Sequence, residues 1–434
     1  MPLELGKINA TGRRVKIAGS DGAIKANMGG AFSVIRDKLE NMKTSETEIR
    51  FLSDEDSDYA LLEKAIARGD FGYLGVHSRI LAEQRSPPSV ADFIESVRGN
   101  IDYSDAQKSF DDYNRARTAL PTRYDSPGQF SILTNLISSV LNAATGRGIE
   151  ISDLPKIATL PTGKINACAV RLQGASSAFL LFDSELLTFC NLFAKAWAQC
   201  FPTKEIEDGR FQLDLNYQSI EGHLSTEGQE GIRRFREVLF AISEKGSPTL
   251  APPYPPTPSI VYPMEKIRDV MEWSVVGHEL AHYMHGDIDP AFSHIARIAA
   301  TSGGSNLPKA YIQEHLADAA GTLLALDCAY NDGTHFSLAY LGSECWYGSM
   351  LLLERFLRFH SGTDGASWQC PDGREHPSWF KRQQLIRSAA FDWYQEDEVK
   401  AILAETISFM DCILDQIWGC LTECDQLDRH DSGN

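Results

Sequence analysis

The sequence predicts an α+β fold that is mainly helical and carries a small antiparallel sheet. Apolar residues recur at helical spacing through most of the chain after residue 127. In this part of the chain, alternation typical of strands occurs in short runs between residues 157 and 182. The length of 434 residues, with 43% hydrophobic and 23% charged residues, is enough to bury a large core in two domains or one elaborated domain.

Residues 1–120 are expected to form a separate, mostly helical N-terminal region. Alternating residues on either side of a Gly-Ser-Asp-Gly turn predict a hairpin at residues 13–26. Helices are predicted at residues 58–67 and 90–97. No residue pattern here points to chemistry, so position alone suggests a regulatory or docking role.

Residues 121–434 form the second predicted domain, which opens with a helix at residues 129–143. Strand-like alternation follows in three short runs, at residues 157–160, 164–172 and 178–182. The last two runs are expected to pair as a hairpin. A helix at residues 185–199 then begins with Asp183 or Ser184 as its N-cap.

Residues 201–263 are predicted to be an insertion that ends in a proline-rich segment. A helix is expected at residues 229–244, and seven prolines between residues 248 and 263 then exclude a regular helix or a central strand. The segment is interpreted as a stiff connector, because the next helix starts immediately after it. The alternative is a proline-rich ligand for a partner protein.

The helix predicted from residue 263 contains the run His278-Glu279-Leu280-Ala281-His282, and Gly286 is expected to end it. Residues four apart lie on one face of a helix, so His278 and His282 can offer two imidazoles to one metal ion. Glu279 lies about 100° further round the helix, where a carboxylate can act as a general base without binding the metal. The alternative is a pair of surface histidines on a structural helix.

A second helix, predicted at residues 309–324, places Glu314 and Asp318 on one face. The small residues Ala317 and Gly321 beside them would let this helix approach another closely. Further helices, predicted at residues 343–359, 379–388 and 398–422, carry apolar residues at helical spacing and are interpreted as core.

Together these residues match the donor set of a catalytic zinc site, which keeps three protein ligands and one open position. His278, His282 and Glu314 are the predicted ligands of Zn²⁺. Asp318, one helical turn after Glu314, is predicted to accept a hydrogen bond from the far nitrogen of one of the two histidines and so to orient it.

Four separated motifs resemble the gluzincin metallopeptidases, most closely the HtpX-like and CAAX-prenyl-protease-like group. The His278-Glu279-Leu280-Ala281-His282 run followed by Gly286-Asp287 is similar to the group's HExxHxxxGD form, and Glu314-His315-Leu316-Ala317-Asp318 is similar to its ExxAD segment. Ile165-Asn166-Ala167-Cys168-Ala169 looks like its NAxA edge strand, and His376-Pro377 with Arg382 looks like its HPxxxxR element. The resemblance covers about residues 128–390.

The chain also departs from that group. It has no predicted membrane span, it has Ala319 where the group often has a basic residue, and it carries the insertion at residues 201–263. A soluble, Lit-like peptidase is therefore the better analogue.

The resemblance implies a helical zincin core that works as a cytoplasmic zinc endopeptidase. Glu279 would take a proton from a zinc-bound water and pass it to the leaving amine. His376 or Arg382 would stabilise the oxyanion. A protein or peptide substrate would add itself to the strand that contains Asn166 and Ala167. The sequence leaves the substrate and the oligomeric state open.

Two other functions are compatible with the same residues. One is a zinc-binding sensor or interaction protein, with a degenerate or structural metal site and with the N-terminal region or the proline-rich segment as its docking parts. An intact Glu279 argues against this, because a structural site has no use for a general base and prefers four closed ligands. The other is zinc-dependent hydrolysis of a bond that is not a peptide.

Composition narrows the partners and the compartment. A net charge of −18 and a pI near 5.1 argue against nucleic acid as a partner, since phosphate binding relies on clustered basic residues. No signal-like or spanning segment is found, which argues against a membrane partner. Nine scattered cysteines suggest free thiols in a reducing compartment, and we therefore expect a cytoplasmic protein.

Overall fold

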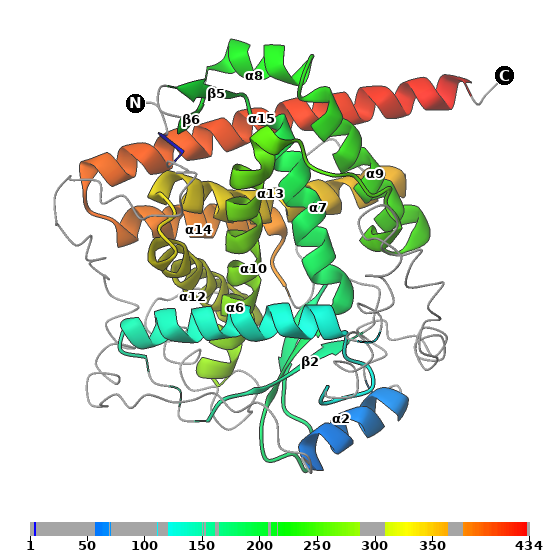
Figure 1. Ribbon diagram of the computed structural model, residues 1–434, viewed down its shortest axis with the longest axis vertical. Coiled ribbons are helices and arrows are strands. Elements are labelled where there is room, and N and C mark those ends of the chain that lie inside the picture. Colours follow the sequence, from blue (N-terminus) through cyan, green and yellow to red (C-terminus); the bar gives the residue numbers. More distant parts are fainter. Residues whose placement is uncertain are drawn as a thin grey trace.

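Helix α10 (Val261–Met284) runs through the middle of the computed structural model and is enclosed by other helices (Figure 1). Its sequence is apolar on most sides, and residues from Ile267 to Ala281 are almost all buried. A helix of this kind belongs in a core rather than at a surface. The structure describes residues 4–5, 57–68, 70, 111, 120–149, 151, 153–160, 165–206, 210–214, 216–286, 309–362 and 376–431.

The helices that contact α10 are α6 (Pro127–Gly146), α7 (Ser184–Cys200), α12 (Lys309–Asn331) and α13 (Phe336–His360). Of the helices around α10, α6, α7 and α12 begin within two residues of the predicted positions, whereas α13 begins at residue 336 instead of the predicted 343. Outside α13 lie α14 (Trp379–Trp393) and α15 (Asp397–Asp431). Helices α12, α13 and α15 are longer than predicted, because their apolar spacing continues into segments that also contain polar residues.

Local signals fix several of the helix ends. Asp183 is the N-cap of α7, and its side chain accepts a hydrogen bond from the backbone N–H of Glu185 at 2.7 Å. Ser378 caps α14 in the same way. Gly286, with φ of 71°, follows the end of α10 as predicted, because glycine adopts this left-handed conformation without steric cost.

The sheet next to α10 has the order β2 (Lys156–Leu160), β4 (Phe179–Asp183), β3 (Ala167–Val170). Strands β3 and β4 form the predicted antiparallel hairpin, but β2 pairs with β4 in parallel. The sheet is therefore mixed, and the expectation of a purely antiparallel sheet was wrong. Every residue of β4 is buried, so this strand takes the centre with a neighbour on each side, whereas the partly exposed β3 lies at the edge.

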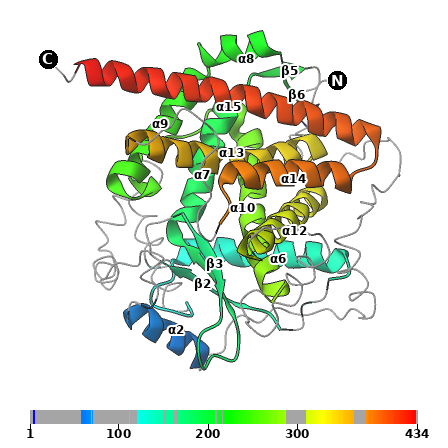
Figure 2. The same ribbon diagram turned by 180° about the vertical axis from the view of Figure 1, so that it is seen from behind.

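The two faces of this sheet pack on different parts of the protein. Leu180 and Phe182 face the main helical core. Phe179 and Leu181 face α2 (Ser57–Arg68), which the sequence predicts and which lies under the sheet in Figure 2. The buried Asp58 of α2 stabilises this contact. It forms an ion pair with Lys156 of β2 and accepts hydrogen bonds from the loop before β4.

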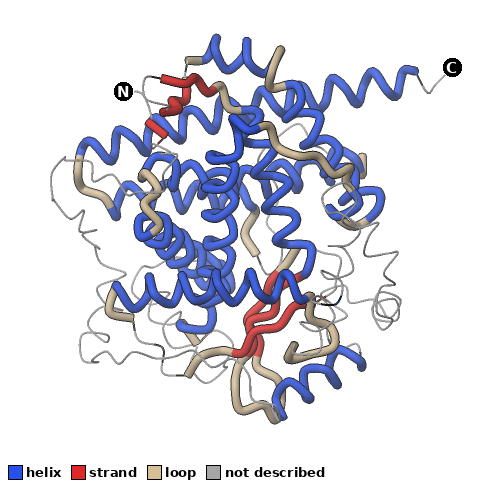
Figure 3. The backbone as a smooth tube through the Cα atoms, viewed as in Figure 1, coloured by secondary structure: helices blue, strands red, loops and turns tan. Residues whose placement is uncertain are grey.

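A second small sheet, which the sequence analysis did not predict, lies at the opposite end of the molecule (Figure 3). Its order is β1 (Glu4–Leu5), β6 (Arg210–Leu213), β5 (Thr203–Ile206). Strands of two to four residues, rich in charged side chains, give no clear alternation. Helices α8 (Tyr217–Leu224) and α9 (Gln229–Lys245) follow them.

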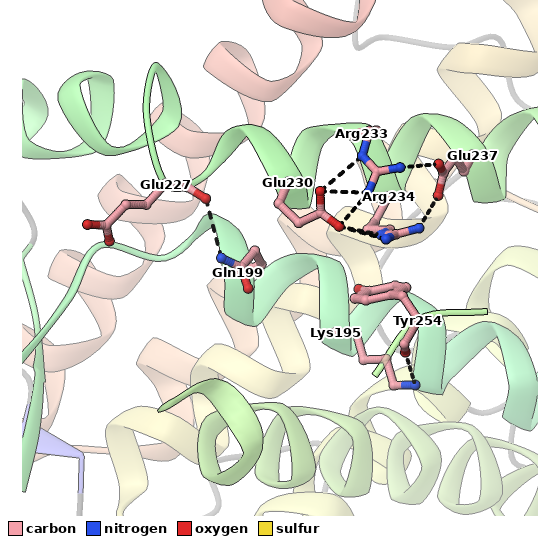
Figure 4. A network of polar contacts seen from close by, with 8 residues as sticks. All are labelled: Lys195, Gln199, Glu227, Glu230, Arg233, Arg234, Glu237 and Tyr254. Carbon is pink, nitrogen blue, oxygen red and sulfur yellow. Dashed lines mark hydrogen bonds and ion pairs between the residues drawn. The ribbon is translucent and has the colours of Figure 1, made fainter. Parts of the chain in front are cut away.

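The proline-rich segment packs against the body of the protein at Tyr254 (Figure 4). The side chain of Tyr254 is buried, and the guanidinium carbon of Arg234 lies 3.9 Å from the centre of its ring. The ammonium of Lys195 donates a hydrogen bond to the Tyr254 carbonyl at 3.3 Å. Two short 3₁₀ turns, Pro248–Leu250 and Pro258–Ile260, frame this residue, and the second leads directly into α10.

Two predicted features, the hairpin at residues 13–26 and the helix at residues 90–97, lie outside the described residues. Among the helices that the structure describes, none has the length and apolar character needed to cross a membrane.

Candidate metal centre

Helices α10 and α12 bring the three predicted ligands together. The Nε2 atoms of His278 and His282 are 3.1 Å apart. The carboxylate oxygens of Glu314 lie 3.6 Å from Nε2 of His278 and 3.5 Å from Nε2 of His282. Within the described ranges, these residues form a group of metal-ligand type whose donor atoms all lie within 4.8 Å of one another.

This donor set fits a tetrahedral ion such as zinc. Two ligands that each lie about 2.1 Å from a tetrahedral ion are roughly 3.4 Å from each other. The two Nε2 atoms are 3.1 Å apart, and each faces its own oxygen of Glu314, Oε2 at 3.6 Å from His278 and Oε1 at 3.5 Å from His282, so the carboxylate can reach a shared ion through either oxygen. Two imidazoles and one carboxylate leave a fourth position open, and a cavity of about 610 Å³ lies beside them.

Two glycines set the spacing between α10 and α12. A Cβ atom added to Gly277 would lie 2.9 Å from Cα of Gly321, and one added to Gly321 would lie 2.7 Å from the backbone nitrogen of His278. The small, buried Ala281 and Ala317 continue the contact. The close approach that the small residues of α12 predict is thus confirmed, and it places Glu314 opposite the two histidines.

Asp318 and Arg382 form the layer behind the ligands. Oδ1 of Asp318 lies 3.0 Å from Nδ1 of His278, on the far side of the ring from the metal-facing nitrogen. The Arg382 guanidinium donates two hydrogen bonds to Asp318, at 2.7 and 2.6 Å, and lies 3.4 Å from Glu314. This arrangement fixes the orientation of the His278 ring.

Opposing effects act on the two carboxyl groups of α12. Burial by itself would raise the pKa of Asp318, but the charge and hydrogen bonds of Arg382 outweigh it and lower the pKa to about 2. Burial opposes ionisation of Glu314 as well, and the imidazoles of His282 and His376 together with nearby positive charge hold its pKa well below the usual range. Both groups are therefore anionic and suited to a cation.

Glu279 lies at the wall of the cavity and is buried, with an exposed fraction of 6%. Burial raises the pKa of the Cys168 thiol on β3, and the negative charge of Glu279 adds to this effect. The carboxylate of Glu279 therefore lies near β3 at the cavity. It is close to the three ligands but does not belong to their group.

The edge strand β3 directs some of its backbone groups away from β4, and in the described part of the chain no strand pairs with them. The N–H of Asp183 donates to the carbonyl of Asn166 at 2.9 Å, which makes these two residues a hydrogen-bonded pair. In an antiparallel ladder such pairs alternate with pairs whose backbone groups point away. The register pairs Ala167 with Phe182, so the peptide groups of Ala167 and Ala169 point away from β4. Asn166 is exposed, and it lines the cavity together with both alanines.

The structure separates the two predicted oxyanion donors. His376 precedes α14, its side chain is 61% exposed, and its Nδ1 lies 3.0 Å from Glu314 at the cavity. Arg382 is buried with its donors directed at Asp318. His285 and His315 of the same helices lie outside the group of three ligands.

The sequence analysis missed one part of the site, an apolar wall of the cavity. It consists of Leu186, Val275, Trp346, Met350 and Trp379. Residues 343–359 lie mostly in the core, as predicted, and Trp346 and Met350 belong to its main buried cluster. No sequence signal shows that these two residues also line a cavity.

Comparison with known protein families, characterised proteins and solved structures found no match to this chain. The site itself is a His-His-Glu group that could hold a metal ion.

Proposed function

We propose that the protein is a zinc-dependent endopeptidase of the gluzincin type. The observation that carries the proposal is the group formed by His278, His282 and Glu314, whose donor atoms lie within 4.8 Å of one another, beside the buried carboxylate of Glu279, which is outside that group. A site with only a structural role has no need of Glu279.

Each residue of the site has a part in the proposed hydrolysis. Zinc held by the three ligands would supply a Lewis acid that polarises a carbonyl and lowers the pKa of water. Glu279 removes the proton from the attacking water and delivers it to the leaving nitrogen. Asp318, which Arg382 keeps ionised, holds the ring of His278 in place.

We assign the oxyanion contact to His376 rather than to Arg382. The imidazole of His376 is exposed at the cavity, whereas the Arg382 guanidinium is buried and already bound to Asp318. An oxyanion donor must lie at the surface of the cavity where negative charge develops, and His376 is the more exposed of the two side chains.

The open side of β3 supports a peptide as the substrate. The outward peptide groups of Ala167 and Ala169 can pair with an extended chain, which gives affinity through main-chain hydrogen bonds. We also propose a reducing compartment such as the cytoplasm, because the seven cysteines with described surroundings are all free thiols.

The test replaces the general base while keeping the ligands. Glu279→Gln should retain stoichiometric zinc and lose hydrolysis by at least about 100-fold, the lower end of the usual contribution of a general base. New protein termini would be compared across the proteome in cells that express the wild-type or the variant protein. Glu314→Ala is the matched variant that should lose zinc as well as activity.

Two results would contradict the proposal. One is an identical set of termini in the wild-type and Glu279→Gln cells. The other is a Glu314→Ala variant that holds zinc as tightly as the parent protein does.

A further inference from the structure

Trp379 lies beside the layer that supports the metal ligands. It is the first residue of α14, and its side chain lines the cavity. Arg382 follows one helical turn later, and its guanidinium carbon lies over the Trp379 ring, 3.9 Å from the ring centre. The proposed hydrolysis gives Trp379 no part, although its ring is in direct contact with the arginine that binds Asp318.

Arg382 contacts both carboxylates of α12 at once. Its Nε and Nη2 atoms donate to Asp318 at 2.7 and 2.6 Å, and its Nη1 atom lies 3.4 Å from Oε2 of Glu314. The ligand Glu314 and the residue that orients His278 therefore depend on one guanidinium. A guanidinium is planar and directs all its N–H groups within its plane, so these contacts last only while the plane keeps its orientation.

The Trp379 ring covers a face of this guanidinium, where no hydrogen bond can form. An aromatic ring in that place attracts the cation through its π electrons, and tryptophan gives the strongest contact of this kind. The side chains of Arg382 and Asp318 are only 8% and 2% exposed. Trp379 and Arg382 both line the cavity, so removal of the ring would open this face of the ion pair to the cavity.

Helix α13 fixes the Trp379 ring. The ring of Trp346 meets it edge on, with the centres 5.9 Å apart and the planes at 89°. The ring centre of Tyr347 lies 6.4 Å away, and both α13 side chains are buried. The Tyr347 hydroxyl in turn lies 3.4 Å from the hydroxyl of Thr322 on α12. Aromatic contacts of this geometry hold a ring in place, so the position of Trp379 is set by the helices that carry the site.

We propose that Trp379 is a positioning residue of the metal centre, whose ring holds the Arg382 guanidinium against the two carboxylates of α12. The proposal rests on the metal site of the proposed function and deepens it. Trp379 acts through Arg382 and not through contact with the metal ion. Its loss should therefore alter the arrangement of the ligands even when no substrate is present.

Two other roles compete for this ring, and they make different predictions. A ring that only packs α14 against α13 would contribute to stability and leave the metal unaffected. A ring that only contacts the substrate, as its place in the cavity allows, would affect peptide binding. Neither role predicts a change at the ligands without peptide, so measurements on the metal-loaded protein alone separate them from positioning.

The test replaces the ring and measures the metal instead of turnover. Zinc affinity would be determined by competition with a chelator, and the visible absorption of the Co²⁺-loaded protein would report the ligand geometry. Trp379→Leu removes the π electrons and should lower zinc affinity about 10-fold, the lower end of the effect of losing groups that orient metal ligands, and should change the Co²⁺ spectrum. Trp379→Phe keeps an aromatic ring and should recover most of both. Trp379→Met, which is also apolar without a ring, takes the place of the leucine variant if that protein does not fold.

A double-mutant cycle with Arg382→Lys shows whether Trp379 acts through the arginine. Lysine keeps the positive charge beside Asp318, but its ammonium is a point charge without a plane to orient. In the Arg382→Lys protein, Trp379→Leu should therefore change zinc affinity by less than about 2-fold.

Trp418→Leu is the matched control. Trp418 also lies against an arginine, with the guanidinium carbon of Arg355 4.2 Å from its ring centre, but it belongs to α15 and does not line the cavity. This variant should lose stability in urea unfolding of the metal-free protein and keep the zinc affinity and Co²⁺ spectrum of the wild type.

The outcomes separate the positioning role from the peptidase function. Wild-type zinc affinity and Co²⁺ spectrum in Trp379→Leu would overturn the positioning role, as would an equal loss of affinity with and without Arg382→Lys, or in Trp418→Leu. If the expected pattern is found but wild-type and Glu279→Gln cells show the same protein termini, positioning stands and the peptidase proposal fails. If the termini differ while Trp379→Leu leaves the metal unchanged, the reverse holds. A wild-type protein that binds neither ion overturns both.

Discussion

Replacing Gly321 with alanine should damage the metal centre without replacing any ligand. The added Cβ would lie 2.7 Å from the backbone nitrogen of His278 and 2.8 Å from the backbone oxygen of Ser274. Ordinary contacts begin at 3.4 Å, so the two helices must separate by about 0.7 Å, the difference between 3.4 and 2.7 Å. Metal sites tolerate ligand displacements of only about 0.2 Å.

We expect Gly321→Ala to lower zinc affinity as well as the stability of the fold. Overpacking costs about 1–3 kcal/mol, and alanine regains about 1 kcal/mol over glycine within a helix, so the net loss of stability is about 0–2 kcal/mol. Because Glu314 lies two turns before Gly321 on the same face of α12, it moves with the helix. Zinc affinity should fall at least about 10-fold, the effect seen when groups that orient metal ligands are lost.

Zinc affinity would be measured by competition with a chelator, and stability by urea unfolding of the metal-free protein. Gly419→Ala is the matched control, because Gly419 lies within helix α15 and a Cβ added there meets nothing within 4 Å. It should gain about 1 kcal/mol and leave zinc affinity unchanged. A Gly321→Ala protein with wild-type zinc affinity would refute the argument that the contact between these helices positions the ligands.

Three further predictions concern groups around the site. Arg382→Ala leaves the Asp318 carboxylate buried without its cation and should cost about 3–5 kcal/mol in urea unfolding; an unchanged midpoint would contradict this. Burial raises the pKa of Glu272 from 4.5 to about 8, so the folded state holds this proton more tightly than the unfolded state. The free energy of unfolding should therefore fall as pH rises from 5 to 8, by up to roughly 4 kcal/mol, and Glu272→Gln should remove that part of the slope. Tyr254→Ala should destabilise by about 2–4 kcal/mol through lost burial and lost cation–π contact, measured by thermal unfolding; a loss below 1 kcal/mol would show that the proline-rich segment is held elsewhere.

The helices and the three ligands could be predicted because both depend on local spacing. The helical period alone puts His278 and His282 on one face, and Glu314 on a face with Asp318. The presence of Gly321 on that face added the information that another helix comes close. These arguments need only residues within a few turns of one another.

The parts that were mispredicted or missed depend on contacts between distant segments. All residues of β4 are buried, so this strand has a neighbour on each side, and β2 pairs with it in parallel. The residue pattern of a single strand does not predict such a pairing. Trp346 and Met350 have the same spacing whether they face a cavity or a helix. The motif offers His376 or Arg382 as the oxyanion donor. The pairing of Arg382 with Asp318, 64 residues earlier in the chain, is visible only in three dimensions.

The edge strand β3 depends on a helix that belongs to the first seventy residues of the chain. Helix α2 covers Phe179 and Leu181 on the side of the sheet that faces away from α10, and Asp58 ties it to β2. A shortened protein that began at residue 121 would leave that apolar face open to water and the sheet supported from one side only. Helix α2 therefore supports the substrate-binding edge that we propose from the opposite face of the sheet. An attempt to isolate the catalytic part should keep α2.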